Sequence, residues 1–198
     1  PAEPPLSAPQ RQMVLHNRIH PDSTAYRIVA PARVPHAIDV AVLHAAVADV
    51  LDRHEILRTV YPDGGSGQGP TQQVVEPDPD QIADLVRIVD DPLPDEGSGA
   101  GSVEELLVAA GLAEQVDLST DLPMRVLVRP VGTDATSLVL MVHHVAADGW
   151  SLRILARDLS EAYTARLAGH PPHWVPLPLQ YADHVLRTEQ RLGDIDDE

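Results

Sequence analysis

The hydrophobic pattern of the chain alternates between two periods. Apolar residues that recur every three or four positions predict helices, whereas short apolar or alternating runs predict strands. Helices are predicted over residues 6–15, 39–53, 103–116, 150–167 and 179–187, and strands over residues 26–30, 57–61, 71–75, 85–89, 124–130 and 137–142. The last strand is short, apolar and rich in β-forming residues, which is typical of a strand covered on both faces.

Capping and turn residues support the ends of these elements. Ser7 and Asp39 are residue types that accept hydrogen bonds from the first amides of a helix, and Gly169 can end the helix that starts near residue 150. Residues 132–136 are predicted to turn one strand antiparallel into the next.

The length of 198 residues is that of one domain or of one large lobe. Residues 1–5 are rich in proline and are predicted to be a linker, which leaves residues 6–198 as the folded unit. Residues 90–102, rich in Pro, Gly, Ser and acidic residues, are predicted to be a surface insertion, because core elements continue on both sides.

Two adjacent histidines, His143 and His144, lie where the strand 137–142 runs into a helix. Side chains alternate across a strand, so we expect the two imidazoles to point to opposite sides, one into a cleft and one packed behind it. This arrangement argues against a metal site formed by both rings. Asp148 and Gly149 follow in a turn, where glycine tolerates backbone angles that other residues do not.

The composition excludes several classes of protein. The net charge is −16 and all 14 basic residues are arginine, so nucleic acid and anionic membranes are not expected as partners. Cysteine is absent, which excludes disulfides, thiolate nucleophiles and cysteine-bound metals and fits a cytoplasmic protein. The chain also contains no Gly-x-Ser-x-Gly elbow, no phosphate-binding glycine loop and no His-Glu-x-x-His spacing.

Two motifs carry a family resemblance. His143-His-Val-Ala-Ala-Asp-Gly149, continued by Trp150-Ser151, resembles the His-His-x-x-x-Asp-Gly signature of the condensation domains of nonribosomal peptide synthetases. Upstream, Arg53-His-Glu-Ile-Leu-Arg-Thr59 is similar to their Arg-His-x-x-Leu-Arg-Thr motif at every defined position.

Two weaker matches extend the resemblance over nearly the whole chain. Ser7, Gln10 and Arg11 fit the outline of the first condensation-domain motif, although Met13 stands where that family commonly shows tryptophan. The run Gln180-Tyr-Ala-Asp183 is similar to a segment that the family carries downstream of the histidine motif. All four matches occur in the order that the family uses.

The resemblance implies a fold. Condensation domains belong with the chloramphenicol acetyltransferase-like acyltransferases, in which each lobe is an α+β, two-layer sandwich: a mixed, mostly antiparallel sheet flanked by helices. A whole domain places two such lobes around a tunnel. This chain has the size of the N-terminal lobe with the C-terminal lobe absent, so we expect the isolated lobe to be inactive and to self-associate through exposed apolar surface.

The resemblance also implies a reaction and its partners. The parent protein is expected to form an amide bond between an acyl or peptidyl thioester donor and the amino group of an aminoacyl acceptor. Both substrates would arrive on the phosphopantetheine arms of donor and acceptor carrier proteins, with no intrinsic cofactor. Neighbouring synthetase domains and the missing lobe are the other expected partners.

For the site residues, the resemblance implies that His144, the second histidine, deprotonates or orients the attacking amine, with His143 packed beside it. Asp148 is similar to a structural carboxylate that forms an ion pair with an arginine of the second motif, either Arg58 or, as the alternative, Arg53. Gly149 would let the backbone approach the substrate, with its amide contacting the developing oxyanion.

Two other interpretations stay open. One is a sister enzyme, either an epimerisation domain or a free acyltransferase; the run after the Asp-Gly pair, Trp150-Ser151, favours condensation. The other is a non-catalytic family member that recruits tailoring enzymes. Such members tend to lose the second histidine, which is present here as His144.

Overall fold

The protein is described by a computed structural model that covers residues 4–64, 69–90 and 102–196. Residues 1–3 of the predicted linker and residues 91–101 of the predicted insertion lie outside this part. Pro5 belongs to the folded unit, because its carbonyl accepts a hydrogen bond from Gln72 Nε2 at 2.6 Å.

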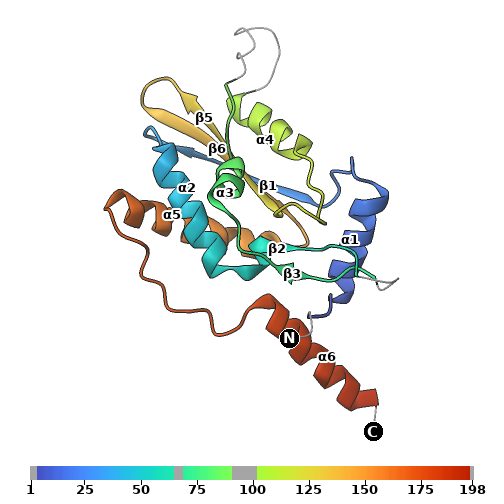
Figure 1. The fold of residues 1–198 in the computed structure, drawn as a ribbon. Coiled ribbons are helices and arrows are strands. Elements are labelled where there is room, and N and C mark those ends of the chain that lie inside the picture. Colours follow the sequence, from blue (N-terminus) through green and yellow to red (C-terminus); the bar gives the residue numbers. More distant parts are fainter. Residues whose placement is uncertain (1–3, 65–68, 91–101, 197–198) are drawn as a thin grey trace.

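A four-stranded mixed sheet forms the centre of the fold (Figure 1). The strand order is β1 (Arg27–Val34), β6 (Ala135–His143), β5 (Met124–Val131) and β4 (Val86–Ile88). Only the β4–β5 pair is parallel. The strand that carries the histidines, β6, is therefore central, as its apolar sequence predicts.

The second sheet is a small antiparallel hairpin of β2 (Thr59–Val60) and β3 (Gln73–Val74). The predicted strand over residues 57–61 is only partly correct, because Glu55–Arg58 form a 3₁₀ helix, η1, before β2 begins. This turn places the Leu57 side chain in the core, where it is fully buried.

Helices cover both faces of the central sheet. The even-numbered residues of β1 and β6, such as Ala30 and Leu140, pack in one core with α2 (Val40–Arg53) and α5 (Gly149–Leu167). The odd-numbered residues face α4 (Val103–Ala113) and, near the end of β6, α1 (Ala8–Ile19). The predicted α+β class and the mixed, mostly antiparallel sheet are confirmed; helices flank the sheet on two sides rather than one.

Glycine lets α4 lie close to the sheet. A Cβ atom added at Gly111 would lie 2.9 Å from Val139 Cγ1 and 3.3 Å from Val29 Cγ1. The first distance is shorter than real Cβ contacts allow, so a larger residue at this position would push α4 away from β1 and β6.

The predicted caps are present. Ser7 accepts a hydrogen bond from the Gln10 amide in a reciprocal capping box, and Asp39 caps α2 through the amides of Ala41 and Val42. Gly169 follows α5 with φ of +85°, the left-handed conformation that ends a helix. A short helix, α3 (Pro79–Asp84), was not predicted from the sequence.

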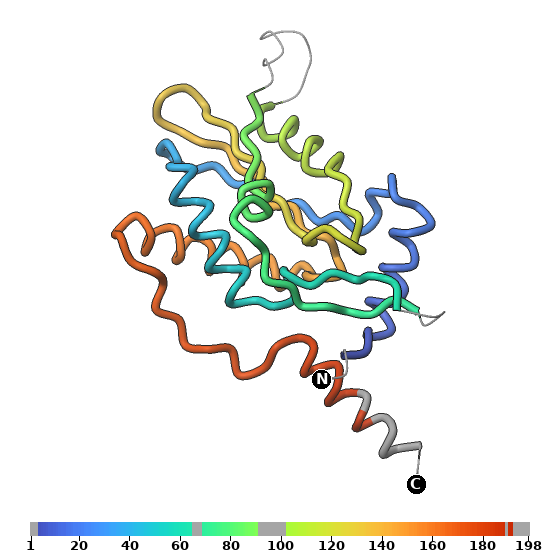
Figure 2. Tube along the Cα trace, in the orientation of Figure 1, coloured from blue at the N-terminus to red at the C-terminus, as the bar shows by residue number. Residues whose placement is uncertain are grey.

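Beyond α5 an extended segment runs along the lower edge of the body in this view to the start of α6 (Tyr181–Asp196) (Figure 2). The first turn of α6 is fixed to α1, since the Tyr181 and Ser7 hydroxyl oxygens are 3.1 Å apart. Within the residues described, no helix is long and apolar enough to cross a membrane.

Candidate active site

The two histidines lie on a tight turn at the end of β6. The Ala146 amide donates to the His143 carbonyl at 3.0 Å, which makes His144 the second residue of a four-residue turn. The His144 amide donates to the Tyr26 carbonyl at 2.7 Å, and the Val145 amide donates to His143 Nδ1 at 3.1 Å. All three amides of the turn are therefore bonded within the protein, and the backbone under His144 is held in one conformation.

His143 is the packed member of the pair. Its side chain is buried on the face of the sheet that α1 covers, and only 4% of the residue is exposed. Burial, with smaller contributions from the nearby Arg27, His144 and His16, lowers the pKa of His143 to about 4. Because its Nδ1 accepts a hydrogen bond, the ring is neutral with the proton on Nε2.

His144 is exposed, in contrast to its neighbour. Among the described residues, no side chain forms a hydrogen bond with its imidazole. The two rings thus occupy different environments, as the alternation of side chains along β6 predicts. An accessible imidazole on a fixed backbone is chemically able to accept a proton from a bound amine.

The predicted ion pair of Asp148 is wrong. Asp148 is exposed and is the N-cap of α5, where its Oδ1 accepts hydrogen bonds from the Ser151 amide at 2.8 Å and the Ser151 hydroxyl at 2.7 Å. These bonds hold the pKa of the Asp148 carboxyl below its usual value, with the Ser151 hydroxyl as the main cause. The carboxylate is satisfied locally, so it has no need of a distant arginine.

Arg58, the first candidate partner, has other contacts. Its Nε donates to the Leu51 carbonyl at 3.2 Å, which satisfies one of the unpaired carbonyls at the end of α2. Its Nη1 donates to the Val75 carbonyl at 3.0 Å and to Glu76 Oε1 at 2.5 Å. Arg58 therefore ties the end of α2 to the strand segment that follows β3.

Arg53, the alternative partner, binds a different carboxylate. Its Nε donates to Asp158 Oδ2 at 2.9 Å, and its guanidinium lies 4.8 Å from the centre of the Trp174 ring. His54 Nε2 is 2.8 Å from the same Asp158 oxygen. Burial lowers the pKa of His54, so the neutral ring donates from Nε2 to an ionised Asp158.

Asp158 was missed at the sequence level, although a signal for it was present. It occupies a position on the apolar side of α5, between the buried Leu155 and Ala162, and is itself only 1% exposed. An acidic residue in the buried stripe of a helix requires a partner. The second family motif contains two basic residues that can pair with such a carboxylate, Arg53 and His54.

Gly149 differs from its expected role in the turn. It is the first residue of α5, and its φ is outside the left-handed region. A Cβ atom added to it would meet no atom within 4 Å. Backbone strain therefore does not require glycine here; what the absent side chain leaves is open space at the Cβ position of the first residue of the helix.

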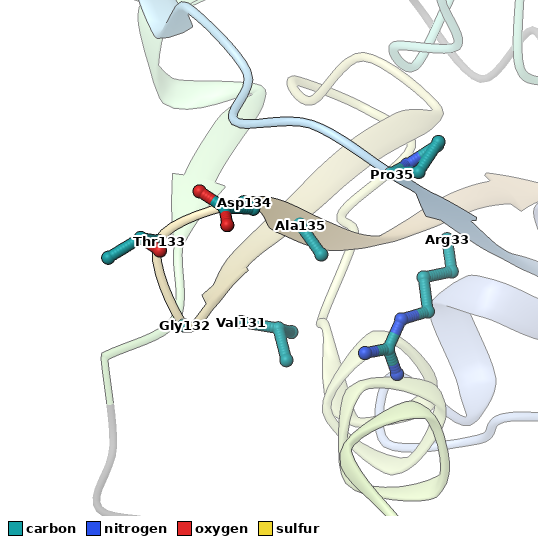
Figure 3. A pocket seen from close by; sticks show the side chains of 7 residues that line it. All are labelled: Arg33, Pro35, Val131, Gly132, Thr133, Asp134 and Ala135. Atoms are coloured by element: carbon teal, nitrogen blue, oxygen red, sulfur yellow. The ribbon is translucent and has the colours of Figure 1, made fainter.

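Other parts of the surface are poorer candidates. A hollow of about 600 Å³ lies at the β5–β6 hairpin and is lined by Arg33, Pro35 and residues 131–135 (Figure 3). At about 3.4 Å per residue along β6, this hollow lies roughly 30 Å from His144. Over the described ranges, no group of three His, Cys, Asp or Glu residues could hold a metal ion.

Comparison with known proteins gives a consistent family. The family model "Condensation domain" matches residues 2–196. The chain is 39% identical over 202 residues to an isonitrile lipopeptide synthase of Mycobacterium tuberculosis and 35% identical over 201 residues to a dimodular nonribosomal peptide synthase of Bacillus subtilis. It is covered completely in both alignments but spans only 8% of each of these relatives.

Two solved structures have the same fold. The X-domain from teicoplanin biosynthesis is 34% identical, with a TM-score of 0.78 over all of this chain and 40% of the X-domain chain. The starter condensation domain of rhizomide synthetase is 20% identical, with a TM-score of 0.76 over 97% of this chain and 44% of its own. The second likeness concerns the fold alone. Taken together with the family match over almost its full length, these findings show that the chain belongs to the condensation-domain family of nonribosomal peptide synthetases.

Proposed function

We propose that the chain is the N-terminal lobe of a condensation domain whose parent protein forms an amide bond between two carrier-bound substrates. The observation that carries the proposal is the difference in environment between the two histidine side chains. His143 is buried, neutral and bonded into the turn, whereas His144 is exposed with its backbone fixed. Condensation domains are acyltransferases in general, and an exposed imidazole on a fixed backbone supports a role for His144 in acyl transfer.

In the proposed step, the amine nitrogen of the acceptor attacks the thioester carbonyl of the donor. The new C–N bond forms, the C–S bond breaks, and the sulfur leaves as the thiol of a phosphopantetheine arm. His144 accepts the proton that the amine loses and can return it to the leaving sulfur. The amide of Gly149, a residue without a side chain and with open space at its Cβ position, would donate to the oxyanion of the tetrahedral intermediate. No intrinsic cofactor takes part, and the partners are donor and acceptor carrier proteins.

We also propose that residues 1–198 alone are inactive and self-associate. The chain matches only 40% of the X-domain chain, and His144 stands at the surface instead of in a tunnel. On α5 next to it, Trp150 is 77% exposed and Ile154, one helical turn further, is 46% exposed. Sedimentation velocity should show dimers or larger species, and Trp150→Ser should shift the chain toward monomer. A strictly monomeric wild-type chain at high concentration would contradict this point.

One observation favours a second candidate, a recruitment domain. The 34% identical X-domain has also been solved in complex with OxyB. A chain of this kind would bind a tailoring enzyme and catalyse nothing. The presence of His144 argues for catalysis, since recruiting members of the family tend to lose the second histidine.

The test uses the parent synthetase with a donor-loaded and an acceptor-loaded carrier protein, followed by mass analysis of the thioester products. If an amide forms, the mass of the loaded acceptor carrier should equal the summed masses of the loaded donor and acceptor carriers minus the mass of the released donor carrier with its free thiol. An acceptor that is joined through a hydroxyl indicates a free acyltransferase. An unchanged mass with an inverted stereocentre indicates an epimerisation domain. An unchanged substrate on both carriers indicates recruitment and overturns the proposal.

A further inference from the structure

We propose that Tyr26 is a positioning residue for the histidine pair, acting on His144 through its carbonyl and on His143 through its ring. This inference rests on the proposed function of His144. Tyr26 lies just before β1, outside every motif that the sequence brings to attention.

The carbonyl of Tyr26 extends the β1–β6 ladder by one pair, to the turn itself. Its oxygen accepts the His144 amide at 2.7 Å, one residue beyond the last paired position, Arg27 with His143. Without this bond the His144 amide would have no hydrogen-bond acceptor, and the backbone beyond the end of β6 would be less constrained. The bond therefore anchors the backbone from which the exposed imidazole projects.

The ring of Tyr26 lies between α1 and the buried histidine. Its centre is 6.1 Å from the centre of the His143 ring and 5.0 Å from that of His16 on α1, to which it is almost perpendicular at 88°. His16 is held in turn, since its Nε2 is 3.0 Å from the Ser23 hydroxyl oxygen. Three rings from α1, the β1 approach and β6 are thus packed in sequence, and Tyr26 is the one in the middle.

The ring also protects the hydrogen bond on which the turn depends. Val145 can donate to His143 Nδ1 only while that nitrogen carries no proton. Burial is the main reason that the pKa of His143 is low, and the charged or titratable groups that face it are Arg27 on β1, His16 on α1 and the adjacent His144. Removing the Tyr26 ring would admit water to His143, so that protonation becomes easier and the Val145 bond is lost at a higher pH.

The hydroxyl of Tyr26 has no hydrogen-bond partner among the described residues, which gives a conservative control. Tyr26→Phe keeps the ring and should behave as wild type. Tyr26→Leu keeps apolar bulk and the carbonyl but removes the aromatic ring. Tyr181→Leu serves as the matched control, because it removes another partly exposed tyrosine whose ring lies on α6.

The first measurement is an NMR titration of the histidine rings in the 198-residue chain, with His143 assigned through His143→Asn. We expect Tyr26→Leu to raise the pKa of His143 by about one unit or more, with no shift in Tyr26→Phe or Tyr181→Leu. An unchanged His143 titration in Tyr26→Leu would overturn the proposal. This readout needs no catalysis, so it stands even if the proposed condensation reaction fails.

The second measurement is the rate of product formation by the parent protein. Tyr26→Leu should lower kcat by about tenfold at acidic pH, where His143 gains a proton and the Val145 bond is lost, because small displacements of a reacting group cost rate steeply. KM for the loaded carriers should change little, and the loss should grow toward low pH. Tyr26→Phe should restore the wild-type kcat and pH profile. Wild-type rates in Tyr26→Leu, or a change confined to KM, would contradict a positioning role.

Discussion

Asp158 on α5 and Arg53 at the end of α2 are joined by a hydrogen bond of 2.9 Å, deep enough that only 1% of the Asp158 side chain is exposed. His54 and Arg157 donate to the same carboxylate. The second family motif is thus connected to the helix that follows the histidines through Asp158, ten residues beyond the Asp148 that was expected to make this connection.

Asp158→Asn should destabilise the protein strongly. The substitution leaves the partly buried Arg53 guanidinium without its counter-charge, which typically costs about 3–5 kcal/mol. Urea denaturation measures the loss. Glu161→Gln, which removes an exposed carboxylate from the same helix, should stay within about 0.5 kcal/mol of wild type. A loss below about 1 kcal/mol for Asp158→Asn would show that the network is not important for stability.

Asp148→Ala should leave the protein folded. Asp148 is an exposed N-cap, and losing such a cap costs about 1 kcal/mol. Asp148→Ser, which keeps a capping oxygen, should lose less. Circular dichroism and thermal unfolding of the purified variants give the answer. Insoluble or unfolded Asp148→Ala would mean that this carboxylate has a structural partner other than Ser151.

Stability should fall with acid because of His143. Its folded pKa of about 4 lies below the ordinary value of 6.5, so the unfolded chain binds the proton more readily and stability is lost as the pH falls from about 6.5 toward 4. Between pH 7 and pH 5 this group should contribute a loss of about 2 kcal/mol. Urea denaturation at the two pH values measures it.

The matched variant is His143→Asn, which offers an oxygen to the Val145 amide but does not titrate. Its stability should decline less between pH 7 and pH 5 than that of wild type, by about the same 2 kcal/mol. Equal declines in the two proteins would show that another group is responsible.

Gly111→Ala should destabilise the protein, although alanine is the better helix former by about 1 kcal/mol. The new methyl group would lie 2.9 Å from Val139 Cγ1 on the central strand, where Val139 is fully buried. We expect a net loss of about 1–2 kcal/mol, measured by thermal unfolding. The loss of stability caused by Gly111→Ala should be smaller in a protein that also carries Val139→Ala, because the clashing methyl group is then absent. If the losses from the two substitutions simply add, the contact does not cause the destabilisation.

Local signals predicted much of the fold. The apolar run of β6, the cap at Asp39 and the glycine at 169 each act through neighbouring residues, and each element is present. The short helix α3 was overlooked although its capping box, Asp78 with Gln81, could be read directly from the sequence.

The partners of Asp158 are harder to predict than a helix cap, because Arg53 and His54 lie about a hundred residues before it. The family resemblance implied that Asp148 pairs with an arginine, but Ser151, three residues on, satisfies the carboxylate locally. A side chain that finds a local hydrogen bond has less need of a distant charge. The environments of His143 and His144 were predictable, since alternation along a strand depends only on backbone geometry.

The central claim is that His144 accepts the proton from the attacking amine, while His143 stabilises the turn through the hydrogen bond from the Val145 amide. The most direct test compares single-turnover rates of amide formation in the parent protein for His144→Ala and His143→Asn, with both loaded carriers at saturation. Loss of a general acid–base group predicts a rate about 10²–10⁴-fold lower for His144→Ala, whereas His143→Asn should stay within about tenfold of wild type near pH 7. A loss below tenfold for His144→Ala in a folded, carrier-binding protein would contradict the account.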